Sequence, residues 1–316
     1  MVATIAMSRP LPLPEMELAG QRVRFIHAAT ADAVPQDAVA YLATAVDPVD
    51  AALIAALPGS VRLIANLGVG YDNINLAAAA ARGLKVSNTP VVTEDTADLA
   101  FALILAACRR VGEGERYLRA GKWRADAAPP PVGTRVNGAT LGIVGFGAIG
   151  QAVARRASGF GMKLLYHSRS ESAAAAEELG AVFCADLHAM LADADIVSIH
   201  APLTDQTRGM IDAAALAACR QGAVLVNTAR GPLVDEAALV AALESGQIAA
   251  AGLDVFDREP VVPEALLAME QVVLTPHIGS ATAQCRTDMV QRGVANIARF
   301  LAAGEAIDPV PLPRGE

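Results

Sequence analysis

Short apolar runs alternate with helical patterns along most of this sequence, as expected of a parallel α/β protein. In the middle of the chain, six of these runs have the length and composition of buried strands. They are Leu141–Gly145, Lys163–Ser168, Ile196–His200, Ala223–Thr228, Ala250–Val255 and Val272–Pro276. Because helical patterns separate them, we predict a six-stranded, doubly wound parallel sheet in this part of the chain.

A smaller set of apolar runs precedes this block. It comprises Val23–Ala28, Val39–Ala43, Leu63–Leu67 and Lys85–Ser87. Helical patterns flank the larger block, over Ala97–Arg110 on one side and from Thr282 to about Ala303 on the other. If the larger sheet is complete, the last helix must return to the earlier strands. We therefore expect a smaller domain built from residues 1–97 and 284–316, and a larger domain of residues 98–283.

Composition narrows the classes of protein and partner. The 316 residues exceed what one core usually organises, and 53% apolar with 18% charged residues is typical of a well-buried α/β protein. A net charge of −8 argues against a nucleic-acid partner, but a small anionic ligand needs only a local positive site. No apolar run reaches the ~20 residues of a membrane span, and prolines interrupt the N-terminal segment. The four cysteines are widely separated, so we expect a cytoplasmic protein without a metal site.

A glycine-rich loop, Gly145-Phe-Gly-Ala-Ile-Gly150, ends the first of the six runs and opens a helical pattern. In this context its first glycine allows a tight turn, its second lets the backbone approach a pyrophosphate, and its third lets the helix pack on the strand. The loop therefore predicts a Rossmann dinucleotide site. Its expected cofactor contacts are Gly145, Gly147, Ala148, Ile149 and Gly150.

The end of the next run predicts which dinucleotide is bound. NAD sites usually carry a carboxylate there, which bonds the ribose 2′-hydroxyl. This chain has Ser168, Arg169 and Ser170 instead. A hydroxyl followed by a guanidinium would bind a 2′-phosphate, whereas a carboxylate would repel it. We therefore expect NADP(H) to be preferred, with NAD as the alternative cofactor.

Three chemically useful side chains follow later strands of the same block. Arg230 comes directly after a buried run, Glu259 stands in an acidic segment after the next one, and His277 lies in the loop Thr275–Ser280. Singly, each could be a structural residue. Together they supply a cation for substrate oxygens, a histidine as the proton donor and a carboxylate to stabilise the protonated ring. Histidine is the residue type whose ordinary pKa, ~6.5, suits proton transfer near neutral pH. This combination suits the reduction of a 2-keto acid.

The sequence as a whole resembles the D-isomer-specific 2-hydroxyacid dehydrogenase family over nearly its full length. The matching segments, in order, are Leu67–Ile74, Gly145–Gly150, His200–Thr204, Asn227–Gly231, Gly252–Phe256, Glu259–Pro260 and Pro276–Ser280. The resemblance implies two Rossmann-like domains: a six-stranded sheet for the cofactor and a smaller flavodoxin-like α/β substrate domain built from both chain ends. It also implies a homodimer.

The family resemblance implies roles for individual residues. Arg230 would bind the substrate, Glu259 would support the histidine, and His277 would contact the substrate and exchange the proton. The backbone N–H groups around Val69 and Gly70 would hold the substrate carboxylate, as expected of an amide nest between glycines. Further cofactor contacts are implied for Thr96, Pro202, Thr207, Thr228, Ala229, Asp254 and Gly279.

Within the family, the segment Tyr166–Ser170 is most similar to the NADPH-dependent glyoxylate/hydroxypyruvate reductases. We therefore predict reduction of a small 2-keto acid to the D-2-hydroxy acid. One alternative is an NAD-linked member acting on lactate, phosphoglycerate or a bulkier keto acid; Ser168 argues against it, and no residues remain after 316 for the regulatory domain common in phosphoglycerate enzymes. A different class, a redox-sensing corepressor or scaffold, would bind the cofactor without efficient turnover.

Overall fold

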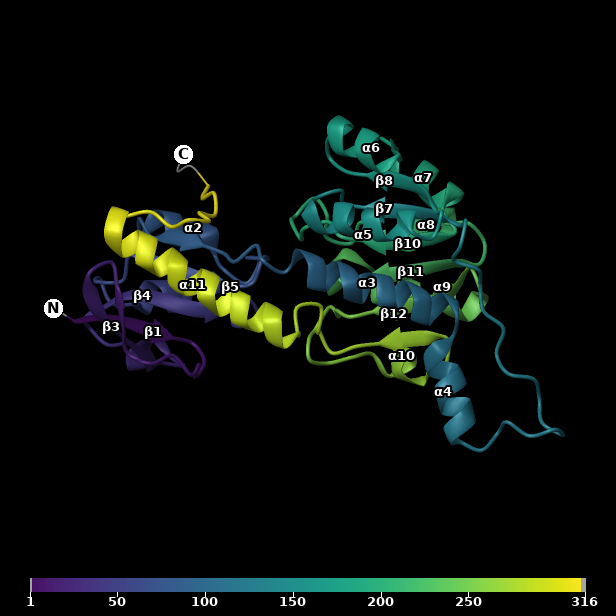
Figure 1. The fold of residues 1–316 in the computed structure, drawn as a ribbon, viewed down its shortest axis with the longest axis horizontal. Coiled ribbons are helices and arrows are strands. Elements are labelled where there is room, and N and C mark those ends of the chain that lie inside the picture. The colour runs from purple at the N-terminus through teal and green to yellow at the C-terminus, as the bar shows by residue number, and fades with distance from the viewer. Residues whose placement is uncertain (1, 314–316) are drawn as a thin grey trace. The chain divides into compact units, whose positions relative to one another are not determined.

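The chain folds into two compact units in a computed structural model, which describes residues 2–313. The N-terminal unit comprises Met1–Val92 and Ala281–Glu316, and the central unit comprises Thr93–Ser280 (Figure 1). The first residue and the last three residues of the expected smaller domain lie outside the described part. Each unit has its own sheet and its own core, so each is described by itself.

The N-terminal unit contains a six-stranded sheet in the order β2-β3-β1-β4-β5-β6. Its strands are β1 (Val2–Met7), β2 (Met16–Leu18), β3 (Gln21–His27), β4 (Ala38–Thr44), β5 (Leu63–Leu67) and β6 (Lys85–Ser87). All neighbours are parallel except β2, which pairs antiparallel with β3. Counted along the chain, the five parallel strands have the order 2-1-3-4-5, which is that of flavodoxin-like folds.

The strands β1 and β2 were not predicted from the sequence. Five of the six residues of β1 are buried, as in several of the strands that were predicted, so its own pattern does not explain why it was missed. The segment that follows contains Pro10, Pro12 and Pro14, a pattern that is typical of an irregular N-terminus. They lie beyond the end of β1, where they interrupt nothing, and β2 is only three residues long.

The described part of this unit also contains three short helical segments, η1 (Ala31–Ala33), α1 (Ala51–Ala56) and α2 (Leu76–Ala81), and one long helix, α11 (Ala283–Ala303). Helix α11 begins after Thr282, whose hydroxyl accepts a hydrogen bond from the Cys285 N–H at 3.0 Å, and it ends at Gly304. In Figure 1 this yellow helix lies along the purple and blue strands of the N-terminal sheet. Its buried face joins the core of that sheet, and Gly293 passes directly over Leu67.

The central unit contains a seven-stranded sheet in which every neighbouring pair is parallel, in the order β13-β12-β11-β10-β7-β8-β9. Its strands are β7 (Thr140–Val144), β8 (Lys163–His167), β9 (Ala181–Phe183), β10 (Ile196–Ile199), β11 (Ala223–Asn227), β12 (Ile248–Leu253) and β13 (Val272–Leu274). All six predicted strands are present. The unpredicted strand β9 has three residues at the edge of the sheet, too few for a periodic signal.

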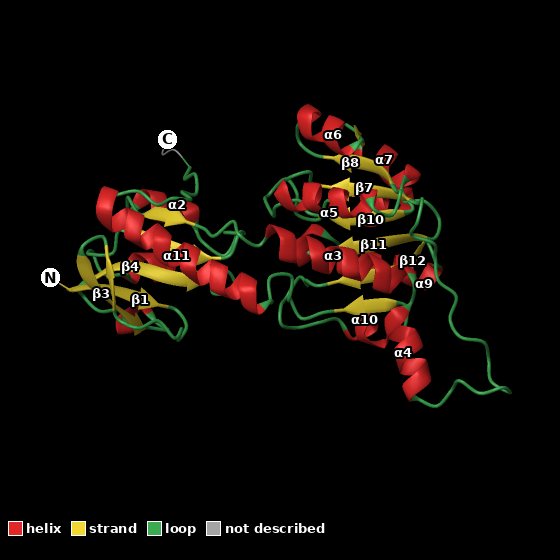
Figure 2. Ribbon diagram, viewed as in Figure 1, coloured by secondary structure: helices red, strands yellow, loops and turns green. Residues whose placement is uncertain are grey.

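Helices cover both faces of the central sheet (Figure 2). Buried residues of α3 (Thr93–Cys108) and α5 (Ala148–Ser158) form the core on one face. The other face is covered by α7 (Leu187–Asp193), α8 (Ala213–Ala218) and α9 (Glu236–Ser245). The remaining elements are α4 (Val111–Arg119), α6 (Ala173–Leu179), η2 (Gly231–Leu233) and α10 (Glu264–Ala268). None of the helices in the described part of the chain is both long enough and apolar enough to span a membrane.

Candidate active site

The predicted site residues of the central unit follow the carboxyl ends of its strands. Because the sheet is entirely parallel, these ends meet at one edge, and the strand order reverses between β7 and β10. Open α/β sheets bind their ligands at this edge, beside the reversal point. The predicted residues of this unit lie in the loops that leave β7, β8, β10, β11, β12 and β13, with four exceptions. Ala148, Ile149 and Gly150 form the first turn of α5, and Thr96 lies in the first turn of α3.

The glycine-rich loop after β7 has the geometry of a dinucleotide cradle. Gly145 has a φ of 94°, and a Cβ there would lie 2.5 Å from the Ala201 nitrogen. A Cβ on Gly150 would lie 2.2 Å from the Gly145 oxygen, so this glycine brings α5 against the strand. Around Gly147, by contrast, there is open space within 4 Å. Since no side chain caps the start of α5, its first N–H groups suit a phosphate.

The loop after β8 contains the three residues expected to recognise the adenosine ribose. The Ser168 hydroxyl donates to the Ser170 carbonyl at 2.6 Å, which folds the loop back on itself. Arg169 between them is exposed, and none of the described residues forms an ion pair with it. The strand end carries no carboxylate; the first one, Glu171, comes after Ser170. The loop therefore presents a guanidinium and hydroxyls where an NAD site presents an acid.

A buried hydroxyl after β11 also fits a bound dinucleotide. Thr228 is 7% exposed, and its Oγ1 has no hydrogen-bond partner within the described residues. A buried polar group without a partner costs about 1–3 kcal/mol. At the carboxyl end of a Rossmann strand, a ligand is the natural partner for this hydroxyl. Two observations thus support cofactor binding independently: the open cradle at Gly147 and the orphaned Thr228 hydroxyl.

Arg230 lies where the chain leaves β11, and a glycine fixes its surroundings. A Cβ on Gly231 would lie 1.9 Å from the Phe256 carbonyl carbon, so only glycine lets this loop press against the loop after β12. The Arg230 carbonyl accepts a hydrogen bond from the Asn227 side chain at 2.9 Å, and its own Nη1 donates to the Ala229 carbonyl at 2.7 Å. This close contact brings the Arg230 segment beside the segment that contains Glu259.

Glu259 and His277 form a bonded pair. His277 Nδ1 lies 2.7 Å from Glu259 Oε2, and Glu259 Oε1 accepts the Phe256 N–H at 3.0 Å. The side chains are 33% and 29% exposed, so the pair is half-buried. Burial alone would raise the pKa of Glu259, but the hydrogen bond and charge of His277, the Phe256 N–H and the charge of Arg230 together hold that pKa below its usual value. Glu259 is therefore a carboxylate at neutral pH.

Asp254 holds the histidine loop in shape, a role that the sequence did not reveal. His277 has a φ of 52°, in the left-handed region, and its N–H donates to the Asp254 carbonyl at 2.9 Å. The fully buried Asp254 carboxylate accepts from the Thr275 hydroxyl at 2.6 Å and from the N–H groups of Ile278 and Gly279, both at 2.8 Å. Burial raises the pKa of Asp254, and these hydrogen bonds oppose that shift.

Asp254 was expected in the cofactor cleft, and it does follow β12 at the correct edge. Its protein contacts, however, serve the loop of His277. No local sequence signal distinguishes these functions, because the hydrogen bonds join residues 21 to 25 positions apart. Only the parallel pairing of β12 with β13 brings them together.

Val69 and Gly70 belong to the other unit, in the loop after β5. Gly68 has a φ of 147°, and a Cβ there would lie 2.5 Å from the Ala45 side chain, so glycine is required. Neither the Val69 N–H nor the Gly70 N–H donates to any described residue. The structure thus brings Arg230, Glu259 and His277 together within the central unit and leaves two consecutive N–H groups available in the N-terminal unit.

A Rossmann cradle and a histidine–carboxylate pair beside an arginine define a class of protein: a dehydrogenase that uses a nicotinamide dinucleotide. Comparison with known families agrees. Residues 101–279 match the NAD-binding domain of the D-isomer-specific 2-hydroxyacid dehydrogenases. This chain therefore belongs to the D-isomer-specific 2-hydroxyacid dehydrogenase family. The resemblance inferred from the sequence is confirmed, and the reaction class is the interconversion of 2-keto and 2-hydroxy acids.

Several named proteins are similar to this chain. The chain is 46% identical over 274 residues to the glyoxylate reductase of Thermococcus litoralis, covering 85% of this chain and 81% of the relative. Among solved structures it is similar to the NADPH-dependent glyoxylate/hydroxypyruvate reductase of Sinorhizobium meliloti in complex with NADP and malonate. That match has 37% identity, a TM-score of 0.87 and 99% coverage of both chains. A glyoxylate reductase from Paecilomyes thermophila matches with 34% identity, a TM-score of 0.87 and 98% coverage of both chains.

Proposed function

We propose that this enzyme reduces glyoxylate or hydroxypyruvate to the D-2-hydroxy acid, with NADPH as the preferred cofactor. The observation that carries the proposal is the 2.7 Å contact between His277 Nδ1 and Glu259 Oε2, next to Arg230 at the cofactor edge of the sheet. A bound reduced nicotinamide supplies the hydride to the keto carbon. The protein then has to bind the substrate and supply one proton.

His277 supplies that proton. Because Glu259 is ionised, it accepts a hydrogen bond from the Nδ1–H of the ring and leaves Nε2 as the nitrogen that exchanges a proton with substrate. The negative charge of Glu259 stabilises the imidazolium before the transfer. As charge develops on the carbonyl oxygen, the Nε2 proton passes to it, and the ring becomes neutral while Nδ1–H stays on Glu259.

The substrate carboxylate is assigned to two groups. Arg230 offers a guanidinium, whose planar fork suits a carboxylate or a keto oxygen. The N–H groups of Val69 and Gly70 offer a neutral amide nest, which binds anions without adding a titrating group. The malonate in the Sinorhizobium meliloti structure is a small carboxylate of the kind such sites would hold.

The preference for NADPH rests on the loop after β8. Arg169 is exposed and Ser168 replaces the acid that would repel a 2′-phosphate. The Sinorhizobium meliloti relative, which was solved with NADP, supports this assignment. Replacing Arg169 with Ala is expected to raise the KM for NADPH by about 10- to 100-fold, the value of one or two charge-assisted hydrogen bonds, with little effect on NADH. The matched control is Arg299→Ala, an exposed arginine in the other unit.

One set of initial rates tests the whole proposal. NADPH and NADH are each measured against glyoxylate, hydroxypyruvate, pyruvate and phenylpyruvate. The highest kcat/KM is expected for NADPH with one of the first two acids. A preference for NADH would overturn the role of Arg169, and a preference for phenylpyruvate would overturn the small substrate. Tight NADPH binding without turnover of any acid would favour a redox-sensing corepressor. The expected homodimer remains a prediction, for which light scattering is the direct test.

A further inference from the structure

Two asparagine side chains hold the backbone of the loop after β5. The Asn88 amide nitrogen donates to the Val69 carbonyl at 2.7 Å, and the Asn66 amide nitrogen donates to the Gly70 carbonyl, also at 2.7 Å. Asn66 is 1% exposed and lies within β5 itself, whereas Asn88 follows β6. The family resemblance assigned a role to Val69 and Gly70 but none to these asparagines.

Holding a carbonyl also aims the neighbouring N–H group. In a trans peptide, the C=O of one residue and the N–H of the next point to opposite sides of the chain. The bond from Asn88 to the Val69 carbonyl therefore turns the Gly70 N–H the other way. In the same manner, the Thr89 N–H donates to the Gly68 carbonyl at 3.0 Å. This bond turns the Val69 N–H away from Thr89. Neither of these two N–H groups has an acceptor among the described residues.

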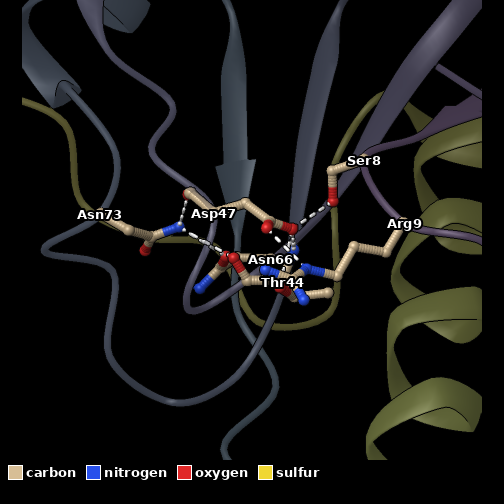
Figure 3. A network of polar contacts seen from close by, with 6 residues as sticks. All are labelled: Ser8, Arg9, Thr44, Asp47, Asn66 and Asn73. Atoms are coloured by element: carbon tan, nitrogen blue, oxygen red, sulfur yellow. Dashed lines mark hydrogen bonds and ion pairs between the residues drawn. The ribbon is translucent and has the colours of Figure 1, made fainter. Parts of the chain in front are cut away.

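The orientation of the Asn66 amide is itself determined by its neighbours (Figure 3). The Asn73 amide nitrogen donates to the carbonyls of Thr44 and Asp47, at 3.1 and 2.9 Å, so this nitrogen must face them. The same nitrogen lies 3.2 Å from Asn66 Oδ1. Because Asn73 presents only donors at this point, Asn66 turns its oxygen to Asn73 and its nitrogen to Gly70.

The Asp47 turn that anchors Asn73 is held by several hydrogen bonds. In Figure 3 the side chains of Ser8, Arg9 and Thr44 converge on the Asp47 carboxylate. The distances are 2.5 Å from the Ser8 hydroxyl, 2.7 Å from Arg9 Nε and 2.7 Å from the Thr44 hydroxyl. A chain of contacts thus runs from this turn through two asparagines to the Gly70 carbonyl. Such a chain gives the loop one preferred conformation.

Asn88 is anchored through its backbone. Its N–H donates to the Asp308 carbonyl at 3.2 Å, and its carbonyl accepts from the Asn296 side chain at 2.9 Å. Asn296 lies on α11 and is fully buried. The position of the Asn88 side chain is therefore determined by the C-terminal part of the chain, which explains why the segment Lys85–Ser87 alone gave no hint of it.

We propose that Asn66 and Asn88 are positioning residues for substrate binding. By holding the Val69 carbonyl, Asn88 keeps the Gly70 N–H aimed at the carboxylate of the 2-keto acid. By holding the Gly70 carbonyl, Asn66 fixes the other side of the same residue. This inference rests on the proposed function, because that function provides the carboxylate. Preorganised donors bind an anion more tightly than donors that must first be turned towards it.

The test compares Asn88→Ala with the unmodified enzyme at saturating NADPH. We expect the KM for glyoxylate to rise about tenfold and inhibition by malonate to weaken by a similar factor. Because Asn88 touches neither the proton donor nor the cofactor loop, kcat should stay within about threefold, and so should the Kd for NADPH. A purely structural defect would instead reduce kcat or the folded fraction, which circular dichroism measures. Asn88→Ser, a smaller change, repeats the measurement if the alanine variant does not fold.

Asn137→Ala is the matched control. Its side-chain amide donates to the Phe160 carbonyl at 3.0 Å, a bond of the same kind. Asn137, however, lies in the central unit just before β7, at the amino end of that strand, whereas the candidate site lies at the carboxyl ends. This control should leave both constants unchanged. If Asn88→Ala folds and shifts neither the KM nor the malonate inhibition beyond twofold, the positioning role is wrong. If the unmodified enzyme reduces no 2-keto acid, the proposed function fails instead, and malonate titration of the Val69 and Gly70 amide resonances still tests the loop.

Discussion

Each candidate catalytic side chain in this enzyme depends on hydrogen bonds or charges from its neighbours. The pair of Glu259 and His277 shows this most directly, because one carboxylate both fixes the ring and supplies a compensating charge. Each partner belongs to a different loop, and Gly231 lets a third loop, carrying Arg230, approach them. The chemistry therefore depends on three strand ends being adjacent in one sheet.

Replacing Glu259 with Gln tests the charge separately from the hydrogen bond. The amide oxygen can still accept the Nδ1–H of His277, but the negative charge is lost. Since reduction needs the protonated ring, we expect the alkaline limb of the pH profile of kcat/KM to move to lower pH. A charge contribution of about 1.4 kcal/mol corresponds to one pH unit. An unchanged profile with unchanged kcat would show that Glu259 does not stabilise the proton.

Asp47 links a single residue to the stability of the N-terminal unit. Burial alone would raise its pKa, but hydrogen bonds from Ser8, Thr44 and Arg9 together hold the pKa below its usual value. A carboxylate of this kind stabilises the fold fully above its unfolded pKa of about 3.9, and the stabilisation disappears as the pH falls through the folded pKa. We expect Asp47→Asn to lower the free energy of unfolding by about 1–3 kcal/mol at pH 7.

Urea titrations from pH 7 to pH 3 measure this difference. It should be constant above about pH 5 and should shrink below the unfolded pKa of about 3.9. A difference that grows towards acid would contradict the assigned sign.

Candidate residues that stand out by their type could be found in the sequence, whereas residues that matter through their position could not. A histidine, a guanidinium and a glycine-rich loop each have few chemical uses, so their order along the chain was informative. Asn66, Asn88 and Asp254 act by holding backbone groups, a task that many polar residues perform in many loops. Their partners become visible only when the sheets are assembled.

Among the elements, the buried parallel strands were the most predictable. Their continuous apolar runs, separated by helical patterns, identified six strands of the central sheet and four of the N-terminal sheet. The strands that were missed, β1, β2 and β9, are either masked by nearby prolines or only three residues long. The two three-residue strands, β2 and β9, are too short to carry a periodic pattern of their own.

The contact between the loops after β11 and β12 can be tested with one methyl group. Gly231→Ala places a Cβ 1.9 Å from the Phe256 carbonyl carbon, so the two loops must separate. We expect a loss of at least about 1–3 kcal/mol in unfolding free energy and a fall in kcat/KM, because Arg230 moves with its loop. Gly114→Ala is the control: nothing lies within 4 Å of its Cβ position in helix α4. It should be neutral or stabilising by up to about 1 kcal/mol.

For the whole molecule, the division into two units has a thermodynamic consequence. Each of the four apolar clusters identified among the described residues draws its members from a single unit. The expected cofactor contacts all lie in the central unit. A ligand stabilises only what it binds, by about 2.7 kcal/mol at 100 times its Kd.

NADPH should therefore stabilise the central unit, which thermal unfolding with and without the nucleotide measures. Hydrogen exchange identifies the protected unit, with slower exchange expected in β7 and β11 and little change in β1 and β3. Equal protection of both units would contradict the assignment of the cofactor contacts to the central unit.

The central claim is that this enzyme reduces a 2-keto acid with His277 as the proton donor. Its most direct test is the kcat for glyoxylate at saturating NADPH, measured for the unmodified enzyme and for His277→Gln. Glutamine can still hydrogen-bond but cannot exchange a proton near neutral pH, so kcat should fall by about 10²- to 10⁴-fold while the Kd for NADPH is unchanged. A His277→Gln variant that retains kcat within about threefold would contradict the account.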